Sequence, residues 1–111
     1  MKFGIHSGLW MRRWTDDLAP IFETVAEIGF DGIEVSLLGI EPDRVGEIRS
    51  MAANNGLEVT CSTGLGPEAD PTSLDPAVRG NALGLLRRSI EITAALGSRS
   101  LAGVVAAPWG V

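Results

Sequence analysis

The sequence predicts an α/β fold: the N-terminal half of a (β/α)8 barrel, with a parallel sheet in the strand order 1-2-3-4. An apolar strand, a loop and an amphipathic helix recur three times between Met1 and Gly97, and a fourth apolar strand follows. A short segment containing glycine joins each helix to the next strand, which is typical of the turns at one end of a parallel sheet. Parallel strands need helices on their faces and neighbours at both edges, and no helix follows the fourth strand. We therefore expect about three and a half strand–helix units in one domain, residues 1–111.

The first unit consists of a strand over Lys2–Ser7 and a helix that ends at Gly29. Thr15 or Asp16 is expected to cap this helix, and Pro20 fits its first turn because an N–H group there needs no partner. Apolar residues at helical spacing predict one buried face. That face consists of Leu18, Ile21, Phe22, Val25 and Ile28.

The second unit has a strand over Gly32–Leu37 and a helix that starts at Pro42 and closes at Gly56. Proline is favoured at the first helical position and glycine just after the last one, so the two residues bracket the helix. Its buried positions are expected to be Val45, Ile48 and Ala52.

The third unit has a strand over Glu58–Ser62, a long loop over residues 63–74 and a helix that ends at Gly97. Asp75 and Pro76 open this helix as its cap and its first residue. The fourth strand is expected over Ser100–Val105. The inner face of the third helix is predicted to consist of Leu83, Leu86, Ile90 and Ala94.

The carboxyl ends of the strands are the predicted ligand side, because parallel α/β folds bind their ligands there and the longer loops lie there. Four segments of that side are candidates: residues 6–14, 34–39, 62–66 and 103–109. Alternation along a strand separates the two faces of the sheet. The helix-facing residues are expected to be Phe3, Ile5, Ile33, Val35, Leu57 and Val59, with Cys61 as a buried structural thiol; His6, Glu34, Ser36 and Ser62 are expected to converge on the opposite face.

Composition excludes several classes of function. The formal net charge of −5 and the pI near 4.7 oppose a nucleic-acid partner, which would need a basic face. No apolar run approaches the ~20 residues of a membrane span, and Arg12-Arg13 is not followed by the apolar stretch of an export signal. The single cysteine cannot form an internal disulfide, so we expect a cytoplasmic protein.

Short motifs give no catalytic centre. Gly64-Leu65-Gly66 is not a phosphate-binding loop, because no Gly-Lys-Ser/Thr follows; we interpret it as a flexible segment of a long loop. The single histidine and the single cysteine fall on opposite faces of the sheet, so no nucleophile–base pair can form. Glu34 is interpreted as a structural carboxylate that pairs with a lysine or arginine on a neighbouring strand.

The chain nevertheless resembles a known family along its whole length. The stretches that carry the resemblance are Lys2-Phe3-Gly4-Ile5 with Trp10 and Trp14, Gly29-Phe30-Asp31-Gly32-Ile33-Glu34, Leu57 to Ser62, Asp75 to Arg79, and Ala102-Gly103 with Trp109. They are similar to the ketose 3-epimerases, that is, the D-tagatose and D-psicose 3-epimerases of the xylose-isomerase-like barrel superfamily. Glycine, phenylalanine, aspartate and glutamate in the second stretch are shared by many relatives, whereas the three tryptophans narrow the resemblance to sugar epimerases.

This resemblance implies a metal-dependent sugar epimerase or isomerase that transfers a proton at C3 of a ketose. Members of the family are full (β/α)8 barrels that bind a divalent metal, usually Mn²⁺, through two glutamates, an aspartate and a histidine. The resemblance also implies that the full-length protein is a homo-oligomer. Those ligands belong to strands of the second half, so this chain is expected to hold no metal ligand and no catalytic residue. The chain alone is therefore expected to be inactive and to supply the wall of the substrate site.

Family contact positions fall on five residues, which we take as the candidate substrate-binding set. Trp14 and Trp109 are expected to stack on the apolar face of a sugar, whereas Trp10 is interpreted as core filling. His6 is expected to contact a sugar hydroxyl, with a satisfied core histidine as the alternative. The set is His6, Trp14, Ser62, Val104 and Trp109.

Other readings stay open at this point. Hydroxypyruvate isomerase and inosose dehydratase are alternative activities on the same scaffold, and an apurinic endonuclease is disfavoured by the acidic pI. A different class is a non-catalytic half-barrel that dimerises into a closed eight-stranded assembly and binds a ligand. Two such copies would leave two strands without a covering helix.

Overall fold

A computed structural model describes residues 1–109, and its four strands form one sheet in the order β1-β2-β3-β4 with every pair parallel. This confirms the predicted order. The strands are β1 (Gly4–His6), β2 (Gly32–Ser36), β3 (Glu58–Gly64) and β4 (Leu101–Val104). The helices are α1 (Ala19–Ile28), α2 (Val45–Asn55) and α3 (Pro76–Ala95), with short 3-10 segments η1 (Ser7–Trp10), η2 (Pro42–Arg44) and η3 (Pro67–Ala69).

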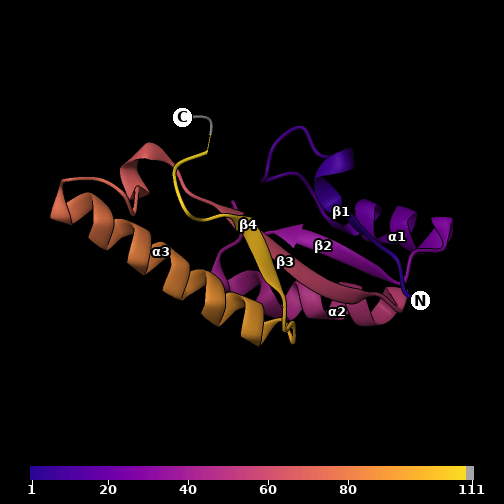
Figure 1. Cartoon of the computed structure of the whole chain (residues 1–111). Helices are drawn as coiled ribbons and strands as arrows, with labels where there is room; N and C mark the ends of the chain where they lie inside the picture. The colour runs from indigo at the N-terminus through magenta and orange to yellow at the C-terminus, as the bar shows by residue number, and fades with distance from the viewer. Residues whose placement is uncertain (110–111) are drawn as a thin grey trace.

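The three helices pack on one face of the sheet (Figure 1). The loops that follow the strands lie together at the carboxyl ends of the strands. Side chains alternate across the sheet, so the helix-facing residues of β2 and β3 enter a common core with the buried faces of the helices. No helix in residues 1–109 is both long and apolar enough to cross a bilayer. The central members of the core are Phe22, Val25, Ile33, Val35, Ile48 and Cys61.

Two residues of the first unit that were predicted to face this core are exposed instead. Ile28 is 59% exposed although it lies on nearly the same side of α1 as the buried Ile21, seven residues earlier; it is the last residue of that helix. Phe3 is 61% exposed, since it precedes the edge strand β1 rather than lying within it. Its backbone is nevertheless fixed, because its N–H donates to Asp31 Oδ2 and its carbonyl accepts from the N–H of Asp31.

The expected cap of α1 is also wrong. Leu18 is the capping residue and makes no side-chain cap, while Asp17 Oδ1 accepts from the N–H of Ala19 at 3.0 Å. Asp16 lies further back and binds the preceding loop. The expected cap of α3 is confirmed, since Asp75 Oδ1 accepts from the N–H of Ala77 at 2.9 Å.

The inner face of α3 is rotated from the predicted one. Leu83 and Ile90 are 54% and 59% exposed, and Ala94 is exposed as well. Most of the residues that are buried instead are small. The buried residues are Ala82, Ser89, Ile92 and Thr93, followed by Leu96 just after the helix. Ala82 packs with Leu65 and Ala69 of the connection after β3, and Ile92 packs in the main core.

Candidate functional site

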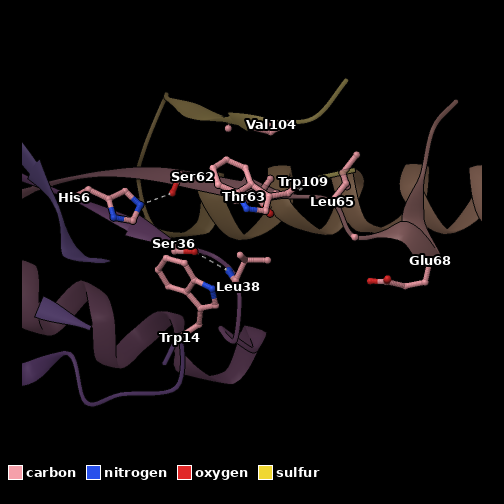
Figure 2. A pocket seen from close by; sticks show the side chains of 13 residues that line it. His6, Trp14, Ser36, Leu38, Ser62, Thr63, Leu65, Glu68, Val104 and Trp109 are labelled. Carbon is pink, nitrogen blue, oxygen red and sulfur yellow. Dashed lines mark hydrogen bonds between the residues drawn. The ribbon is translucent and has the colours of Figure 1, made fainter. Parts of the chain in front are cut away.

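A cavity of about 610 Å³ opens at the carboxyl ends of the strands, on the sheet face opposite the helices. Figure 2 shows its wall, which includes side chains from all four strand–loop connections. All five candidate substrate-binding residues lie in this wall. The full lining consists of His6, Trp14, Ser36, Leu38, Ser62, Thr63, Gly64, Leu65, Gly66, Glu68, Gly103, Val104 and Trp109.

His6 occupies the polar end of the cavity, where β1 ends. Its Nδ1 accepts a hydrogen bond from the backbone N–H of Gly8 at 2.9 Å, and its Nε2 lies 3.0 Å from Ser62 Oγ. The sheet register places His6 beside Glu34, whose Oε1 is 3.8 Å from Nε2. The predicted convergence of His6, Glu34 and Ser62 is therefore present in the geometry.

Glu34 does not have the partner expected from the sequence. Among residues 1–109 the ionisable side chain in contact with it is His6, and no lysine or arginine is paired with it. Ser36 differs from the other polar residues that were predicted to converge. It is buried, and its Oγ accepts from the N–H of Leu38 at 3.3 Å. Its hydroxyl oxygen thus serves the turn after β2.

Trp14 forms a side wall of the cavity and contacts His6 edge to face, with the ring centroids 6.1 Å apart and the planes at 77°. The loop that carries it is held by Asp16, whose Oδ2 accepts from the N–H groups of Arg12 and Arg13 at 2.8 and 3.1 Å. These backbone hydrogen bonds lower the pKa of Asp16 below its usual value of 3.8. Trp14 is left 42% exposed, with its ring available to a ligand.

The last part of the wall comes from β4 and the residues after it. The N–H of Trp109 donates to the carbonyl of Leu65 at 2.8 Å, which ties the end of the described chain to the connection after β3. Leu65 is itself 1% exposed, so Gly64-Leu65-Gly66 forms a packed part of the wall. Trp109 is 72% exposed beside the cavity.

Glu68 is the one lining residue outside the four segments that the sequence singled out. It lies in η3, within the long connection, where no motif or periodicity marked it. Its carboxylate turns back over Gly66, where a Cβ atom would be only 2.4 Å from Oε1. In the sequence, the glycine at position 66 is the one sign that another group could approach the backbone closely there.

The described residues do not form a metal centre. No group of three histidine, cysteine, aspartate or glutamate side chains in residues 1–109 could hold a metal ion. Cys61 is a free, buried thiol on the helix side of the sheet, as expected, and its burial raises the pKa. Trp10 packs against the core, in agreement with its interpretation as core filling.

Comparison with known proteins places this arrangement in a family. The model of the xylose isomerase-like TIM barrel matches residues 22–110. The chain belongs to the xylose isomerase-like TIM barrel family. It is 32% identical to L-ribulose 3-epimerase of Mesorhizobium japonicum, over 99% of this chain and 37% of that protein. It is 31% identical to D-psicose 3-epimerase of Agrobacterium fabrum, over 100% of this chain and 39% of that protein.

Solved structures agree with the sequence relatives. The fold superposes on a crystal structure of D-psicose 3-epimerase in the presence of D-fructose with a TM-score of 0.89 and 29% identity, over 100% of this chain and 39% of that one. Within the xylose isomerase-like TIM barrel family, the chain thus corresponds to the N-terminal part of the barrel and spans less than two-fifths of the relatives' length.

Proposed function

We propose that this chain is the substrate-wall part of a ketose 3-epimerase. The observation that carries the proposal is the cavity, which combines two exposed indole rings with a polar end made by His6 and Ser62. Indole rings stack on the apolar face of a sugar, and hydroxyl and imidazole groups hydrogen-bond its rim. The names of the relatives favour a ketose 3-epimerase over hydroxypyruvate isomerase or inosose dehydratase.

The charges in the cavity favour a neutral ketose over a phosphorylated one. The lining residues include no lysine or arginine, and they include the carboxylate of Glu68. A phosphate group carries about two negative charges near neutral pH, and proteins usually bind it with arginine, lysine or clustered backbone N–H groups. An unphosphorylated ketose is the substrate class that fits these groups.

The chemistry of C3 proton transfer is assigned to the rest of the protein. Among residues 1–109, no group of three histidine, cysteine, aspartate or glutamate side chains could hold the metal that this chemistry would use. We propose that the full-length protein binds a divalent metal, Mn²⁺, through residues outside this chain. We also propose that it works as a homo-oligomer in the cytoplasm, where the free thiol of Cys61 stays reduced.

Titration with ketoses tests this assignment. Adding D-fructose or D-psicose should shift the NMR signals of the indole N–H groups of Trp14 and Trp109, and D-fructose 6-phosphate should bind more weakly. Trp14→Ala should weaken ketose binding roughly 3- to 10-fold, because a stacking surface is lost. Trp10→Phe is the matched control and should leave binding unchanged, since Trp10 packs on the core.

The proposal fails if no indole signal moves at ketose concentrations well above about 1 mM, the upper end of ordinary KM values. It also fails if the phosphorylated sugar binds better than the neutral one.

A further inference from the structure

The hydrogen bonds around His6 determine which ring nitrogen carries its proton. The backbone N–H of Gly8 can only donate, so Nδ1, 2.9 Å away, must accept and holds no proton. A neutral imidazole has one N–H group, which is then on Nε2. Nε2 lies 3.0 Å from Ser62 Oγ, and the N–H therefore donates to that oxygen.

This arrangement also orients the hydroxyl of Ser62. Because Ser62 Oγ already accepts from His6, its own hydrogen cannot point at Nε2 and has to be donated elsewhere. Ser62 is partly exposed and lines the cavity, and its register neighbours on β2 and β4 are Ser36 and Ala102. Ala102 has no polar side chain, Ser36 Oγ accepts from the N–H of Leu38, and among residues 1–109 the hydrogen-bond partner of Ser62 Oγ is His6. Figure 2 shows the hydroxyl at the polar end of the cavity, beside His6.

We propose that His6 is a positioning residue that makes the Ser62 hydroxyl a hydrogen-bond donor toward the cavity. The pocket then recognises an acceptor at this point of its ligand, namely the oxygen lone pair of a sugar hydroxyl. The identity of the ligand rests on the proposed function, whereas the proton on Nε2 and the direction of the Ser62 hydroxyl do not.

Further contacts favour this proton position. Glu34 Oε1 lies 3.8 Å from Nε2, so a negative charge faces the nitrogen that carries the proton. Gly8 has no side chain, and a Cβ atom there would lie 2.8 Å from His6 Nδ1 and 3.3 Å from the Trp14 ring. The backbone N–H can therefore approach Nδ1 closely, and the imidazole is held between Gly8, Trp14 and Ser62.

The first part of the test reads the proton directly on the ligand-free chain. Long-range ¹H–¹⁵N NMR of the imidazole should show a proton on Nε2 and a bare Nδ1 at neutral pH. A proton on Nδ1 would overturn the proposal, because Ser62 would then be free to donate to the imidazole.

The second part measures what Ser62 recognises. The probes are D-fructose and its deoxy and deoxyfluoro analogues at C4, C5 and C6, because fluorine can accept a weak hydrogen bond but cannot donate one. At one position the deoxy analogue should bind roughly 3- to 10-fold more weakly, while the fluoro analogue retains most of the affinity. Ser62→Ala should abolish this difference, and so should His6→Phe.

Conservative replacement separates positioning from packing. His6→Gln retains an N–H donor near the place of Nε2 and should preserve the discrimination, unlike His6→Phe. Ser50→Ala, on the outer side of α2, is the control and should change neither affinity nor discrimination. Equal discrimination in Ser62→Ala and in the unmodified chain would overturn the proposal. Failure of every ketose to bind would instead refute the proposed function. The imidazole spectrum would still show whether Nε2 carries the proton, as the His6–Ser62 hydrogen bond requires.

Discussion

Gly103 shows how strongly single residues shape the wall of the cavity. Its φ of 132° lies outside the range of ordinary side chains, and a Cβ atom would be 1.8 Å from the carbonyl oxygen of Thr63. Since the obstacle is the backbone of the adjacent strand β3, it cannot turn aside as a flexible side chain could. The close approach of β4 to β3 at the cavity therefore requires glycine.

Gly103→Ala should destabilise the protein by about 3 kcal/mol, because it adds backbone strain to a collision with the neighbouring strand. Gly84→Ala is the matched control: Gly84 lies within α3 with nothing within 4 Å of its added Cβ. That substitution should stabilise the helix by up to about 1 kcal/mol. Urea unfolding monitored by circular dichroism measures both. An unchanged midpoint for Gly103→Ala would contradict the account of this strand pair.

At the scale of elements, the sequence predicts the sheet better than it predicts the helix faces. Parity along β1, β2 and β3 places His6, Glu34 and Ser62 together, because a strand has only two faces. A helix has a continuous range of faces, and α3 carries two apolar stripes. The stripe with Leu83 and Ile90 has the larger side chains, but the stripe with Ala82, Ser89, Ile92 and Thr93 is the buried one. The sequence alone does not show which side of the helix the core and the connection after β3 cover.

Truncation of one isoleucine on each stripe tests the observed face of α3. Ile92 is 5% exposed, and Ile92→Ala should cost about 2–4 kcal/mol of unfolding free energy because it leaves a cavity in the core. Ile90 is 59% exposed, and Ile90→Ala should change stability by less than about 0.5 kcal/mol. Equal costs for the two substitutions, again from urea unfolding, would mean that the buried face is assigned incorrectly.

The loop after β1 should loosen in acid, because Asp16 holds it. Hydrogen bonds from the N–H groups of Arg13 and Arg12 lower the pKa of this carboxylate below 3.8. A lowered pKa in the folded state means that the stabilising contribution is present above 3.8 and is lost as the pH falls through the lowered pKa. The NMR signal of the Trp14 indole should therefore change in that range, below pH 3.8.

Asp16→Ala should give the acid form of this indole signal already at neutral pH. Asp43→Asn removes an exposed charge from η2 and serves as the control, with no expected effect on Trp14. If the Trp14 signal of the Asp16→Ala chain matches the unmodified chain at neutral pH, Asp16 is not what holds the loop.

At the scale of the whole molecule, one sheet face carries the core and the other carries the cavity that we propose as the ligand site. The alternation of the strands therefore separates stability from recognition. Glu68 is the exception that sequence reasoning could not reach, because a long connection folds back to the cavity through tertiary contacts alone. The exposed rings of Trp14 and Trp109 lie on the same side as the polar pair His6 and Ser62.

The cavity wall without a metal-ligand cluster predicts different behaviour for the chain alone and for the chain joined to the rest of a barrel. Alone with Mn²⁺ and D-fructose in heavy water, it should exchange no C3 proton above a metal-only control, because residues 1–109 contain no metal-ligand cluster. Fused in place of the matching N-terminal 39% of D-psicose 3-epimerase from Agrobacterium fabrum, it should support C3 exchange.

Within that fusion, Trp14→Ala should lower kcat/KM about tenfold through lost ketose contact, whereas Trp10→Phe should not. NMR of the C3 proton measures both. Exchange by the chain alone would place the proton-transfer chemistry in this part of the protein. A well-folded but inactive fusion would show instead that the cavity wall built by His6, Trp14, Ser62 and Trp109 does not accept the substrate of its relatives.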